Sequence, residues 1–539
     1  MIILGITGGH DAGWCIIKDG KILAAYEKER FSRIRHDSGE VVSLIPTTLK
    51  DLNISVYDID MIATSEPVYK NTEPGFLKLS GQKYTRPDEW VFQVIEIFDR
   101  IIPCVSVPHH LSHAAYARYT SSFRETAVIT WDGGGDFYTE DAYTSTSVSM
   151  WTENKLQWLK RIENSDFGSL WDMYSKAIFL NENAAGKLMG LAAYGTNKLV
   201  PQFKERFLVP LQGTWIGAYT IKNCWPDYFA PPFISESISW QEEHAKDIAY
   251  AIQAITEEAG MSIIKKLSVI SNCKNLSIAG GVALNGYLNT AIAKSGLYQN
   301  LHIPPSVHDG GICIGAALFV YHHLLENKLL FQKQDLAFLG RQFNKQDTEK
   351  CLINSMYHSY YEIDLEKAEL KAAKEIVKGK IVAWCNGRSE HGPRALGNRS
   401  ILGLPHAKDT KDRLNKIIKF REDFRPVAPV VLAEDAKEFF DMDWDSPYMM
   451  YIVKANPEIV SKIPSGLHID NTARVQTVTT ADSLGRIVAH IKKLTGIGCV
   501  LNTSFNVRTP IVDTPNHALE AFEEVPIDHM YLNGYWITR

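Results

Sequence analysis

The feature that most restricts the fold of this chain is a pattern that occurs twice in its first third. Residues 2–7, 14–17 and 22–26 are apolar runs separated by the turn sequences GGHDAG and KDGK, which predicts three strands. Residues 127–131 are again apolar and precede the loop DGGGD, and a second hairpin, TSTSVSMW–TENK–LQWLKRI, follows. Both segments predict a first strand, a glycine- and aspartate-rich loop and a hairpin. We therefore infer an internal duplication.

A duplicated α/β unit of this kind is the architecture of the actin-like (sugar-kinase and heat-shock-type) ATPase fold. A helix over roughly 241–267 and a strand over 275–279 continue the pattern, and the turn AGGVALN follows. Glycine loops let backbone N–H groups approach phosphate oxygens, and a helix N-terminus favours an anion. We expect a nucleotide at these turns, with these candidate contacts: Gly133, Gly134, Gly280, Gly281 and Asn285.

Length and composition are typical of a soluble enzyme with more than one domain. The chain has 539 residues, 45% of them hydrophobic and 22% charged, and a formal net charge of −5, which argues against a nucleic-acid-coating surface. None of the eight cysteines forms a CxxC motif, so reduced thiols in the cytoplasm are expected. The sequence has no basic leader segment, so export is not predicted, and no apolar run of roughly 18 residues, so a membrane span is not predicted.

Residues 326–350 are mixed and polar, and we place the domain boundary near 345, giving domains 1–345 and 346–539. The second domain begins with a predicted helix at 366–378 and a strand at 381–385. Its segments NGRSEHGPRALGNRS and KFREDFRP place arginine and lysine beside glycine and small polar residues, although the whole chain is acidic. This clustering favours a pocket for anions, in particular phosphates, over scattered surface arginines.

The stretch VPHHLSHAAYA holds three histidines, and His109 and His113 are spaced i, i+4. On a helix both rings would leave the same face and could bind a metal ion or an anion. The alternative is a packed helix end, and for His110 packing or a bond to a ligand residue is the expected role. Asp132 opens DGGGD and Asp309 precedes a glycine pair, which is also a common use of aspartate as a turn cap.

Nine segments, in order along nearly the whole chain, together resemble the NodU/CmcH carbamoyltransferase family. They are GGHDAGWCIIKDGKILAAYEKERFSRIRH, VPHHLSHAAYA, TWDGGGD, GKLMGLAAYG, AGGVALN, GRSEHGPRALGNRS, KFREDFRP, ARVQTV and LNTSFNVRTPIV. The family includes O-carbamoyltransferases of nodulation-factor and antibiotic biosynthesis. The resemblance implies an actin-like N-terminal domain similar to the threonylcarbamoyl-transferring protein of tRNA modification, and a YrdC-like α/β C-terminal domain.

The resemblance also implies a two-step reaction. The YrdC-like domain would make carbamoyladenylate from carbamoyl phosphate and ATP, with Mg²⁺ accompanying the ATP. The actin-like domain would then transfer the carbamoyl group to a hydroxyl of a natural product or sugar and release AMP. Adenylation supplies a good leaving group, and adjoining sites limit hydrolysis of the labile mixed anhydride.

For the first domain, the resemblance implies that His109, His113, Asp132 and Asp309 bind one metal. This ligand set suits Fe(II), Mn(II) or Zn(II), and we expect Fe(II). His10 is either the base that takes the hydroxyl proton or a turn histidine bonded to backbone. Arg35, the second catalytic candidate, stands where relatives often carry lysine; it can clamp an oxyanion but cannot act as a titrating base. Lys187 would contact phosphate or lie on the surface.

In the second domain, Lys419-x-Arg421 and Ser504-x-Asn506 match the paired KxR and SxN motifs of YrdC-like proteins. Cationic side chains would neutralise triphosphate charge, while serine and asparagine would fix oxygens by hydrogen bonds. Further candidates for ATP or carbamoyl phosphate are Arg388, Arg394, Met449 and Arg474, of which Arg388 could be structural and Met449 a core residue. The segment NVRTPIV is one residue shorter than the usual NVRGEPIV.

Three rival functions remain open at this stage: a small-molecule kinase, a threonylcarbamoyl-type tRNA-modifying enzyme and a metal-binding scaffold. The expected partner is a small hydroxyl acceptor, without nucleic acid or membrane, and a homodimer remains open. No motif identifies the acceptor. Its pocket is expected from loops 66–92 and 200–240, with these aromatic residues: Tyr69, Phe76, Tyr84, Trp90, Trp215, Trp225, Tyr228 and Phe229.

Overall fold

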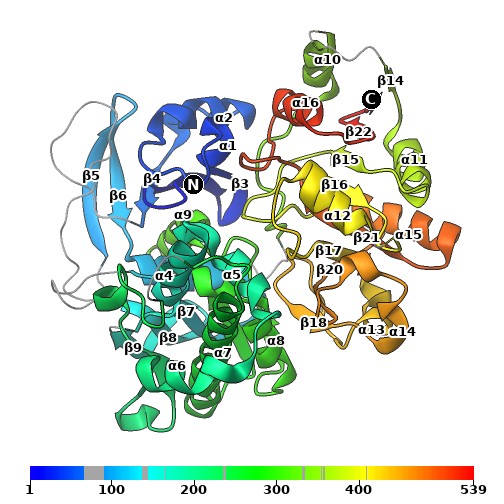
Figure 1. Cartoon of the computed structure of the whole chain (residues 1–539). Coiled ribbons are helices and arrows are strands. Elements are labelled where there is room, and N and C mark those ends of the chain that lie inside the picture. The colour runs from blue at the N-terminus through cyan, green and yellow to red at the C-terminus, as the bar shows by residue number, and fades with distance from the viewer. Residues whose placement is uncertain are drawn as a thin grey trace. The chain divides into compact units, whose positions relative to one another are not determined.

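The computed structural model describes the whole chain except residues 66–89, 136–143, 164, 235–237, 330–333, 354, 356–358 and 408. The chain forms two compact units, whose elements are labelled in Figure 1. The first unit comprises Met1–Lys28 and His36–Leu336, and the second comprises Glu29–Arg35 and Ala337–Arg539. Each unit is described by itself below.

The first sheet of the first unit has the strand order β3-β2-β1-β4-β6-β5. Its strands are β1 (Ile2–Thr7), β2 (Gly13–Lys18), β3 (Lys21–Glu27), β4 (Met61–Thr64), β5 (Val91–Ile97) and β6 (Arg100–Ser106). Strands β1, β2 and β3 form an antiparallel meander, and β4 and β6 then add parallel to β1. The three predicted N-terminal strands are confirmed.

The second sheet repeats this arrangement, with the order β13-β12-β7-β8-β9. Its strands are β7 (Glu125–Trp131), β8 (Thr144–Thr152), β9 (Lys155–Glu163), β12 (Asn275–Ala279) and β13 (Asn300–His302). The meander β7-β8-β9 is antiparallel, and β12 and β13 add in parallel, as β4 and β6 do in the first sheet. The two sheets share strand order and direction, so the predicted duplication and the actin-like α/β class are confirmed.

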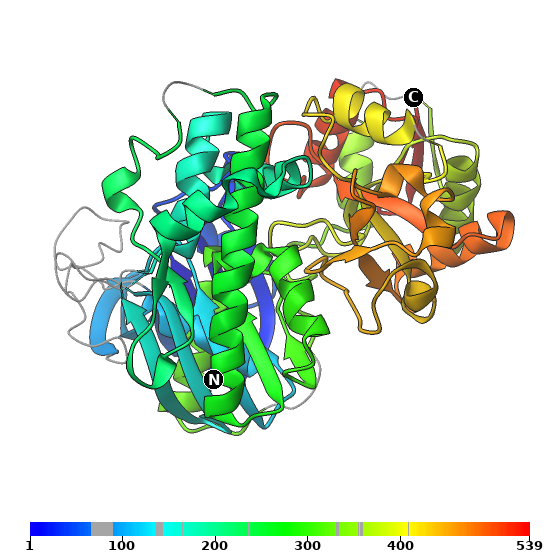
Figure 2. The ribbon, with the colours of Figure 1, turned by 60° about the horizontal axis from the view of Figure 1, so that its bottom comes forward.

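Two short helices lie buried in this unit, α3 (His109–Thr120) and α9 (Ile312–Leu318), and they pack against each other. Gly315 permits the contact, because a Cβ there would lie 1.8 Å from the carbonyl oxygen of Ser112. The long helix α7 (Glu243–Ser271), seen lengthwise in Figure 2, packs against α5 (Ala185–Ala192) and α8 (Gly286–Lys294). A helix was predicted here over 241–267, and the structure extends it by one turn.

The second unit is built on an eight-stranded mixed sheet with the order β14-β23-β22-β15-β16-β21-β17-β20. Its strands are β14 (Tyr360–Glu362), β15 (Val382–Cys385), β16 (Arg399–Gly403), β17 (Ala428–Leu432), β20 (Gln476–Val478), β21 (Cys499–Ser504), β22 (His529–Leu532) and β23 (Tyr535–Thr538). This unit therefore has the predicted α/β class.

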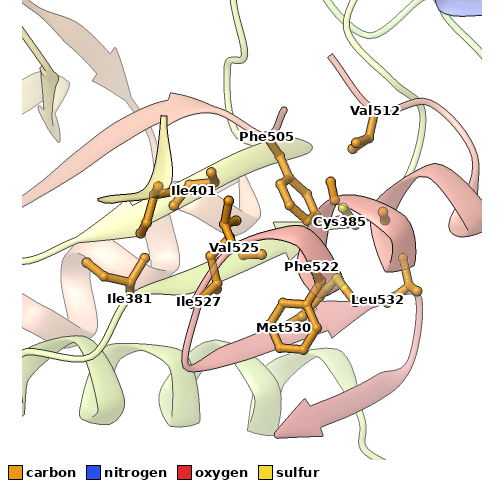
Figure 3. Close-up of a cluster of buried hydrophobic side chains, with 14 of the residues drawn as sticks. Ile381, Cys385, Ile401, Phe505, Val512, Phe522, Val525, Ile527, Met530 and Leu532 are labelled. Atoms are coloured by element: carbon orange, nitrogen blue, oxygen red, sulfur yellow. The ribbon is translucent and has the colours of Figure 1, made fainter. Parts of the chain in front are cut away.

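Two apolar clusters form the core of the second unit. Helices α11 (Leu365–Val377) and α15 (Ser483–Thr495) contribute to one of them, which includes Trp384 and Trp536. Helix α16 (Pro515–Glu524) contributes Phe522 to the other, where it lies with Met530 (Figure 3). Every strand residue of β15 and β16 is buried, as expected for central strands covered on both faces.

The predicted boundary at 345 is displaced. Residues 337–345, which we assigned to the first domain, belong to the second unit, as do Glu29–Arg35. The reason is a set of backbone contacts that sequence patterns do not reveal: the Gly340 and His391 N–H groups donate to Ser389 and Ala337 carbonyls, at 3.0 and 2.7 Å. No helix in the described part of the chain is long and apolar enough to cross a membrane, and all eight cysteines are free.

Candidate metal centre and anion pocket

Four side chains from three segments of the duplicated unit converge on one point. His109 and His113 lie on the first turns of α3, Asp132 follows β7, and Asp309 begins the short helix η8 (Asp309–Gly311). The Nε2 atoms of His109 and His113 are 3.2 Å apart and lie 3.2 and 3.0 Å from Asp132 Oδ2. The same nitrogens lie 3.6 and 3.3 Å from Asp309 Oδ1. The structure therefore brings all four predicted metal ligands together.

This donor set fits a divalent cation. Four ligand atoms about 2.1 Å from a tetrahedral metal are roughly 3.4 Å from one another, close to the separations observed here. Burial alone would raise the pKa of Asp132, but hydrogen bonds from His109 and His113 outweigh it and hold that pKa well below its usual range. Asp132 is therefore ionised and available as a ligand. Among the described residues, these four form one of two groups with the composition and spacing of a metal site.

Backbone N–H groups of two glycines, which follow the neighbouring strands β7 and β12 of the second sheet, position Asp132. The N–H groups of Gly133 and Gly281 donate to Asp132 Oδ1 at 2.8 and 3.2 Å. Gly280 adopts φ +90°, and a Cβ there would lie 2.1 Å from the carbonyl oxygen of Trp131, so only glycine fits. The predicted nucleotide turn thus has an observed structural role in holding a metal ligand. Its contact with a nucleotide stays a prediction.

Other candidates of the first unit have defined partners. Asn285 caps α8 through the Leu288 N–H group and exchanges hydrogen bonds with Gln253. His110 is buried and lies 3.2 Å from both Ser147 Oγ and the Gly134 carbonyl, and burial lowers its pKa to about 3, so it is neutral. Its role is packing, as expected. Lys187 lies over the Phe179 ring at 5.5 Å, on helix α5.

His10 belongs to a hydrogen-bonded network of side chains. Asp11 lies between two imidazoles, with its carboxylate oxygens 2.9 Å from His10 Nδ1 and 2.7 Å from His36 Nδ1. The two rings stack at 4.9 Å, and His10 Nε2 is 3.2 Å from Asn183 Oδ1. Both Asp11 and His36 hold φ near +55°, a left-handed conformation that few non-glycine residues adopt. His10 is thus bonded to side chains and not, as the alternative held, to backbone.

The charge of His10 depends on Asp11. The hydrogen bond that His10 donates to the Asp11 carboxylate is the main reason that the pKa of His10 is raised to about 9. In this arrangement His10 is mostly protonated at neutral pH, so it must lose a proton before it can act as a base. His308 lies 3.8 Å from Asp11 and 3.4 Å from Glu27, and thus extends the network to the residue before Asp309. Sequence reasoning missed Asp11, His36 and His308. Asp11 and His36 lie in the first of the nine segments that resemble the family, and His308 directly precedes Asp309.

Asp172 was also missed, and it is an unusual carboxylate. It lies on α4 (Phe167–Phe179), and its Oδ2 would be 3.6 Å from a Cβ added to Gly133. Burial, followed by the negative charge of Asp132, raises the pKa of Asp172 to about 7. A single aspartate inside a helix carries no motif, so only the folded chain shows that it adjoins the Asp132 loop.

The aromatic residues expected around the acceptor divide into different environments. Trp215 is 2% exposed, and Trp90 packs against Phe319 and His323, so these two contribute to packing. Tyr228 donates to Glu182. Lys176 Nζ lies 5.2 Å from the ring centres of both Tyr228 and Phe229. Tyr69, Phe76 and Tyr84 lie outside the described residues.

The second unit brings the KxR and SxN motifs together. Lys419 Nζ donates to the Ser504 carbonyl at 2.8 Å, to the Asn506 carbonyl at 2.7 Å and to Asn506 Oδ1. Burial, followed by the charge of Arg421, lowers the pKa of Lys419 well below its usual range. Arg421 Nε donates to Asn415 Oδ1 at 2.7 Å, while its buried Nη2 has no hydrogen-bond partner in the described part of the chain.

Further guanidinium groups gather around this pair, and Glu422, 3.8 Å from Arg425, offsets only part of their charge. The electrostatic neighbours of Arg474 are Arg394, Arg421 and Arg425, and burial lowers its pKa before their repulsion adds to the effect. The buried Nε atoms of Arg394 and Arg474 have no hydrogen-bond partner among the described residues. Burial lowers the pKa of Arg421 only to about 9, so it remains cationic at neutral pH. Buried cations that lack partners are costly unless an anion joins them.

A buried carboxylate shapes the loop that carries Arg394. Glu390 Oε1 accepts hydrogen bonds from the backbone N–H groups of residues 396–399, at 2.8 to 3.1 Å. These four hydrogen bonds to one oxygen fold residues 391–399 into a loop around Glu390. Sequence reasoning did not single out this glutamate, because nothing in its spacing distinguishes it from a surface residue.

Three other predicted site residues lie in the second unit. Arg388 donates to the carbonyl oxygens of Leu339 and Gly340 and so ties the start of the unit to its sheet. Met449 is 2% exposed in a cluster with Ala337, Leu396 and Ala428, the core alternative stated above. Arg35, predicted as a catalytic residue of the first domain, belongs to the second unit.

Comparison with known proteins identifies relatives along most of the chain. Family models of the carbamoyltransferase N-terminus and C-terminus match residues 2–318 and 373–539. Nodulation protein NolNO of Sinorhizobium fredii is 30% identical over 100% of this chain and 83% of its own length. Nodulation protein U of Rhizobium tropici is 26% identical over 100% of this chain and 96% of its own. An uncharacterized protein of Synechocystis is 31% identical, covering 100% and 96%.

Solved structures are more distant. Full-length HypF in its phosphate- and nucleotide-bound form matches 60% of this chain and 55% of its own, with 13% identity and a TM-score of 0.35. An activator of 2-hydroxyisocaproyl-CoA dehydratase from Clostridium difficile matches 60% and 96%, with 14% identity and a TM-score of 0.32. The family models together span both units, and on that evidence this chain is a member of the carbamoyltransferase family.

Proposed function

We propose that this carbamoyltransferase makes carbamoyladenylate in its second unit and transfers the carbamoyl group to a small-molecule hydroxyl in its first unit. The observation that carries the proposal is the buried cationic cluster of Lys419, Arg421 and Arg474, in which Arg421 Nη2 and Arg474 Nε have no hydrogen-bond partner among the described residues. Such a pocket suits the phosphates of ATP and carbamoyl phosphate. The His/Asp cluster of the first unit has the opposite character and suits a cation.

The first step releases two phosphate products. Water cleaves carbamoyl phosphate to carbamate and inorganic phosphate, and a carbamate oxygen then attacks the α-phosphorus of ATP. The bond to the β-phosphate breaks, leaving carbamoyladenylate and pyrophosphate. In this step Lys419 and Arg421 would neutralise charge on the phosphoryl oxygens, while Ser504 and Asn506 hold the lysine in place.

The second step moves the carbamoyl group to the acceptor. The hydroxyl oxygen attacks the carbamoyl carbon, AMP leaves, and the hydroxyl proton passes to a base. His10 Nε2 is our candidate for that base, with Asp11 holding the ring through Nδ1. His109, His113, Asp132 and Asp309 would hold a divalent cation, for which we expect Fe(II). When bound, this ion supplies Lewis-acid charge.

Product analysis tests this function. With ATP, Mg²⁺ and carbamoyl phosphate, we expect pyrophosphate and carbamoyladenylate, formed only when carbamoyl phosphate is present, and AMP once the carbamoyl group passes to an acceptor or to water. An actin-like kinase would instead produce ADP independently of carbamoyl phosphate, and that result would replace our proposal. A protein without turnover under these conditions would favour the scaffold alternative. Carbamoylation of tRNA alone would point to the threonylcarbamoyl-type alternative.

A further inference from the structure

A short segment from the N-terminal part of the chain is built into the second unit. Residues Glu29–Arg35, which include the helix α1 (Glu29–Ser32), belong to that unit although residues on both sides belong to the first. Arg30 is 5% exposed and donates to the Gly392 carbonyl at 2.7 Å. The segment is therefore anchored beside the loop that leads to Arg394.

Two further arginines of the segment bind the loop that follows the SxN motif. Arg33 donates to the carbonyl oxygens of Pro510 and Ile511, at 2.6 and 2.8 Å. Arg35 donates from Nε and Nη2 to the carbonyl oxygen of Thr509, at 3.3 and 3.2 Å. The conformation of residues 509–511 thus depends on residues that lie more than 470 positions earlier in the chain.

The Thr509 carbonyl connects Arg35 directly to the anion pocket. Asn506 Nδ2 donates to the same oxygen at 2.5 Å, and Asn506 Oδ1 accepts from Lys419 Nζ. Arg35 and Asn506 therefore share one acceptor, and Lys419 is the next residue in this chain of hydrogen bonds. The charge of Arg35 acts on Lys419, Arg421 and Arg425, whose pKa values it helps to lower.

Arg35 has capacity for another partner. Its two hydrogen bonds to Thr509 use Nε and Nη2, and its Nη1 makes no hydrogen bond to the described residues. Guanidinium carries five donors in a fixed plane, so it can hold a carbonyl with one edge and bind an anion with another; an ammonium group cannot do both in that geometry.

We propose that Arg35 is an anion-binding residue of the second unit, where its guanidinium contacts a phosphoryl oxygen of ATP or carbamoyl phosphate. This inference rests on the proposed function only for the identity of those ligands. It reassigns Arg35 from the acceptor chemistry of the first unit to the pocket of Lys419 and Asn506. It also gives the Glu29–Arg35 segment a functional reason to lie in the second unit.

The test compares binding of ATP and of carbamoyl phosphate, each measured by calorimetry, in four variants of the full chain. Arg35→Gln removes the charge, Arg35→Lys keeps it, and Arg33→Lys perturbs the same loop without touching Thr509 O. Arg413→Gln is the control, because its guanidinium lies in the same unit but pairs with Asp528. One charge-assisted hydrogen bond corresponds to a roughly 10- to 100-fold loss of affinity.

We expect Arg35→Gln to weaken one of the two ligands by that factor, Arg35→Lys to recover it only in part, and Arg413→Gln to stay within about twofold of wild type. The ligand that is weakened identifies the phosphate that Arg35 contacts. Equal losses in Arg33→Lys and Arg35→Lys would reduce Arg35 to a residue that holds the loop, as would unchanged binding of both ligands in Arg35→Gln. A fifth variant, Lys419→Ala, tests the proposed function separately. If it also binds both ligands normally, the proposed function itself is wrong. Arg35→Lys covers the case in which Arg35→Gln does not fold.

Discussion

At the scale of single residues, the buried carboxylates near the metal centre differ in what stabilises their charge. Asp132 is surrounded by two histidines and two backbone N–H groups, which keep it ionised. Asp172 makes no hydrogen bond to the described residues, and burial together with the charge of Asp132 raises its pKa to about 7. Ionised Asp172 therefore destabilises the folded state, which suggests that the residue serves ligand binding.

Asp172→Asn should stabilise the protein, and more so at higher pH. The pKa of an unfolded aspartate is about 3.9, so the penalty for ionised Asp172 is absent below that pH, grows as the pH rises and is complete above about 7. We expect a gain in the free energy of unfolding of roughly 2 kcal/mol at pH 8 and a smaller gain at pH 5. Urea melts at the two pH values measure both gains. A gain that is equal at both, or larger at pH 5, would contradict the shifted pKa.

Site residues could be predicted from the sequence where they belong to a short sequence pattern. His109 and His113 are spaced one helical turn apart, and Asp132 and Asp309 each open a glycine loop, so the family resemblance could be carried over to the four residues that converge in the structure. Asp172 and Glu390 have no such local signature. Their importance arises from burial against loops that are distant in the chain, and a single sequence does not report burial of a lone carboxylate.

At the scale of elements, the metal loop depends on close packing between a helix and a strand end. The N-terminus of α4 lies directly on the loop after β7, and Ser169 Oγ donates to the Gly133 carbonyl at 2.7 Å. A Cβ at Gly168 would lie 2.3 Å from the backbone nitrogen and Cα of Gly133. Two backbones can approach this closely only because Gly168 has no side chain.

Gly168→Ala should displace the loop that holds Asp132 and thereby weaken metal binding. We expect a loss of at least about 10-fold in affinity for Fe(II) or Zn(II), a typical cost of disturbing the groups that orient a metal ligand. Gly186→Ala is the matched control, because it lies in α5 with no atom within 4 Å of the added Cβ, and alanine favours a helix. Metal titrations of both variants give the comparison. Wild-type affinity in Gly168→Ala would show that the contact does not position Asp132.

Element prediction was most accurate where apolar runs are bounded by turns. The strand predicted at 275–279 has the same limits in the structure, and the helix predicted at 366–378 differs by one residue at each end. The strand order of the eight-stranded sheet was not predicted. Neighbours such as β16 and β21 are separated by about a hundred residues, so their pairing is non-local and no short pattern encodes it.

At the scale of the whole molecule, the assignment of residues 29–35 shows the limit of placing a domain boundary by composition. Sequence reasoning singled out neither Arg30 nor Arg33, and it assigned Arg35 to the first domain. Their carbonyl partners at 392 and 509–511 are contributed by the far end of the chain. A net charge of −5 likewise hides a local excess of cations around Lys419, because composition averages over the whole chain.

Lys419→Ala and His113→Ala should abolish different halves of the activity. Without Lys419, the cation that neutralises the phosphates is gone, so we expect pyrophosphate release to fall by at least about 10³-fold while metal content stays at the wild-type level. Without His113, the metal site loses one of its four ligands. That variant should lose metal and transfer to the acceptor, yet still release pyrophosphate when carbamoyl phosphate and ATP are supplied.

Chemically prepared carbamoyladenylate separates the two steps most sharply. We expect it to restore transfer in Lys419→Ala, because that variant lacks only the step that makes the intermediate, and to leave His113→Ala inactive. Elemental analysis of anaerobically purified protein and quantification of pyrophosphate and AMP supply the measurements. If Lys419→Ala fails to use the supplied intermediate, the basic pocket takes part in transfer as well. If His113→Ala retains its metal, the four residues contributed by α3, the loop after β7 and η8 are not the ligands of that metal. The assignment of transfer to the first unit would then lose its basis.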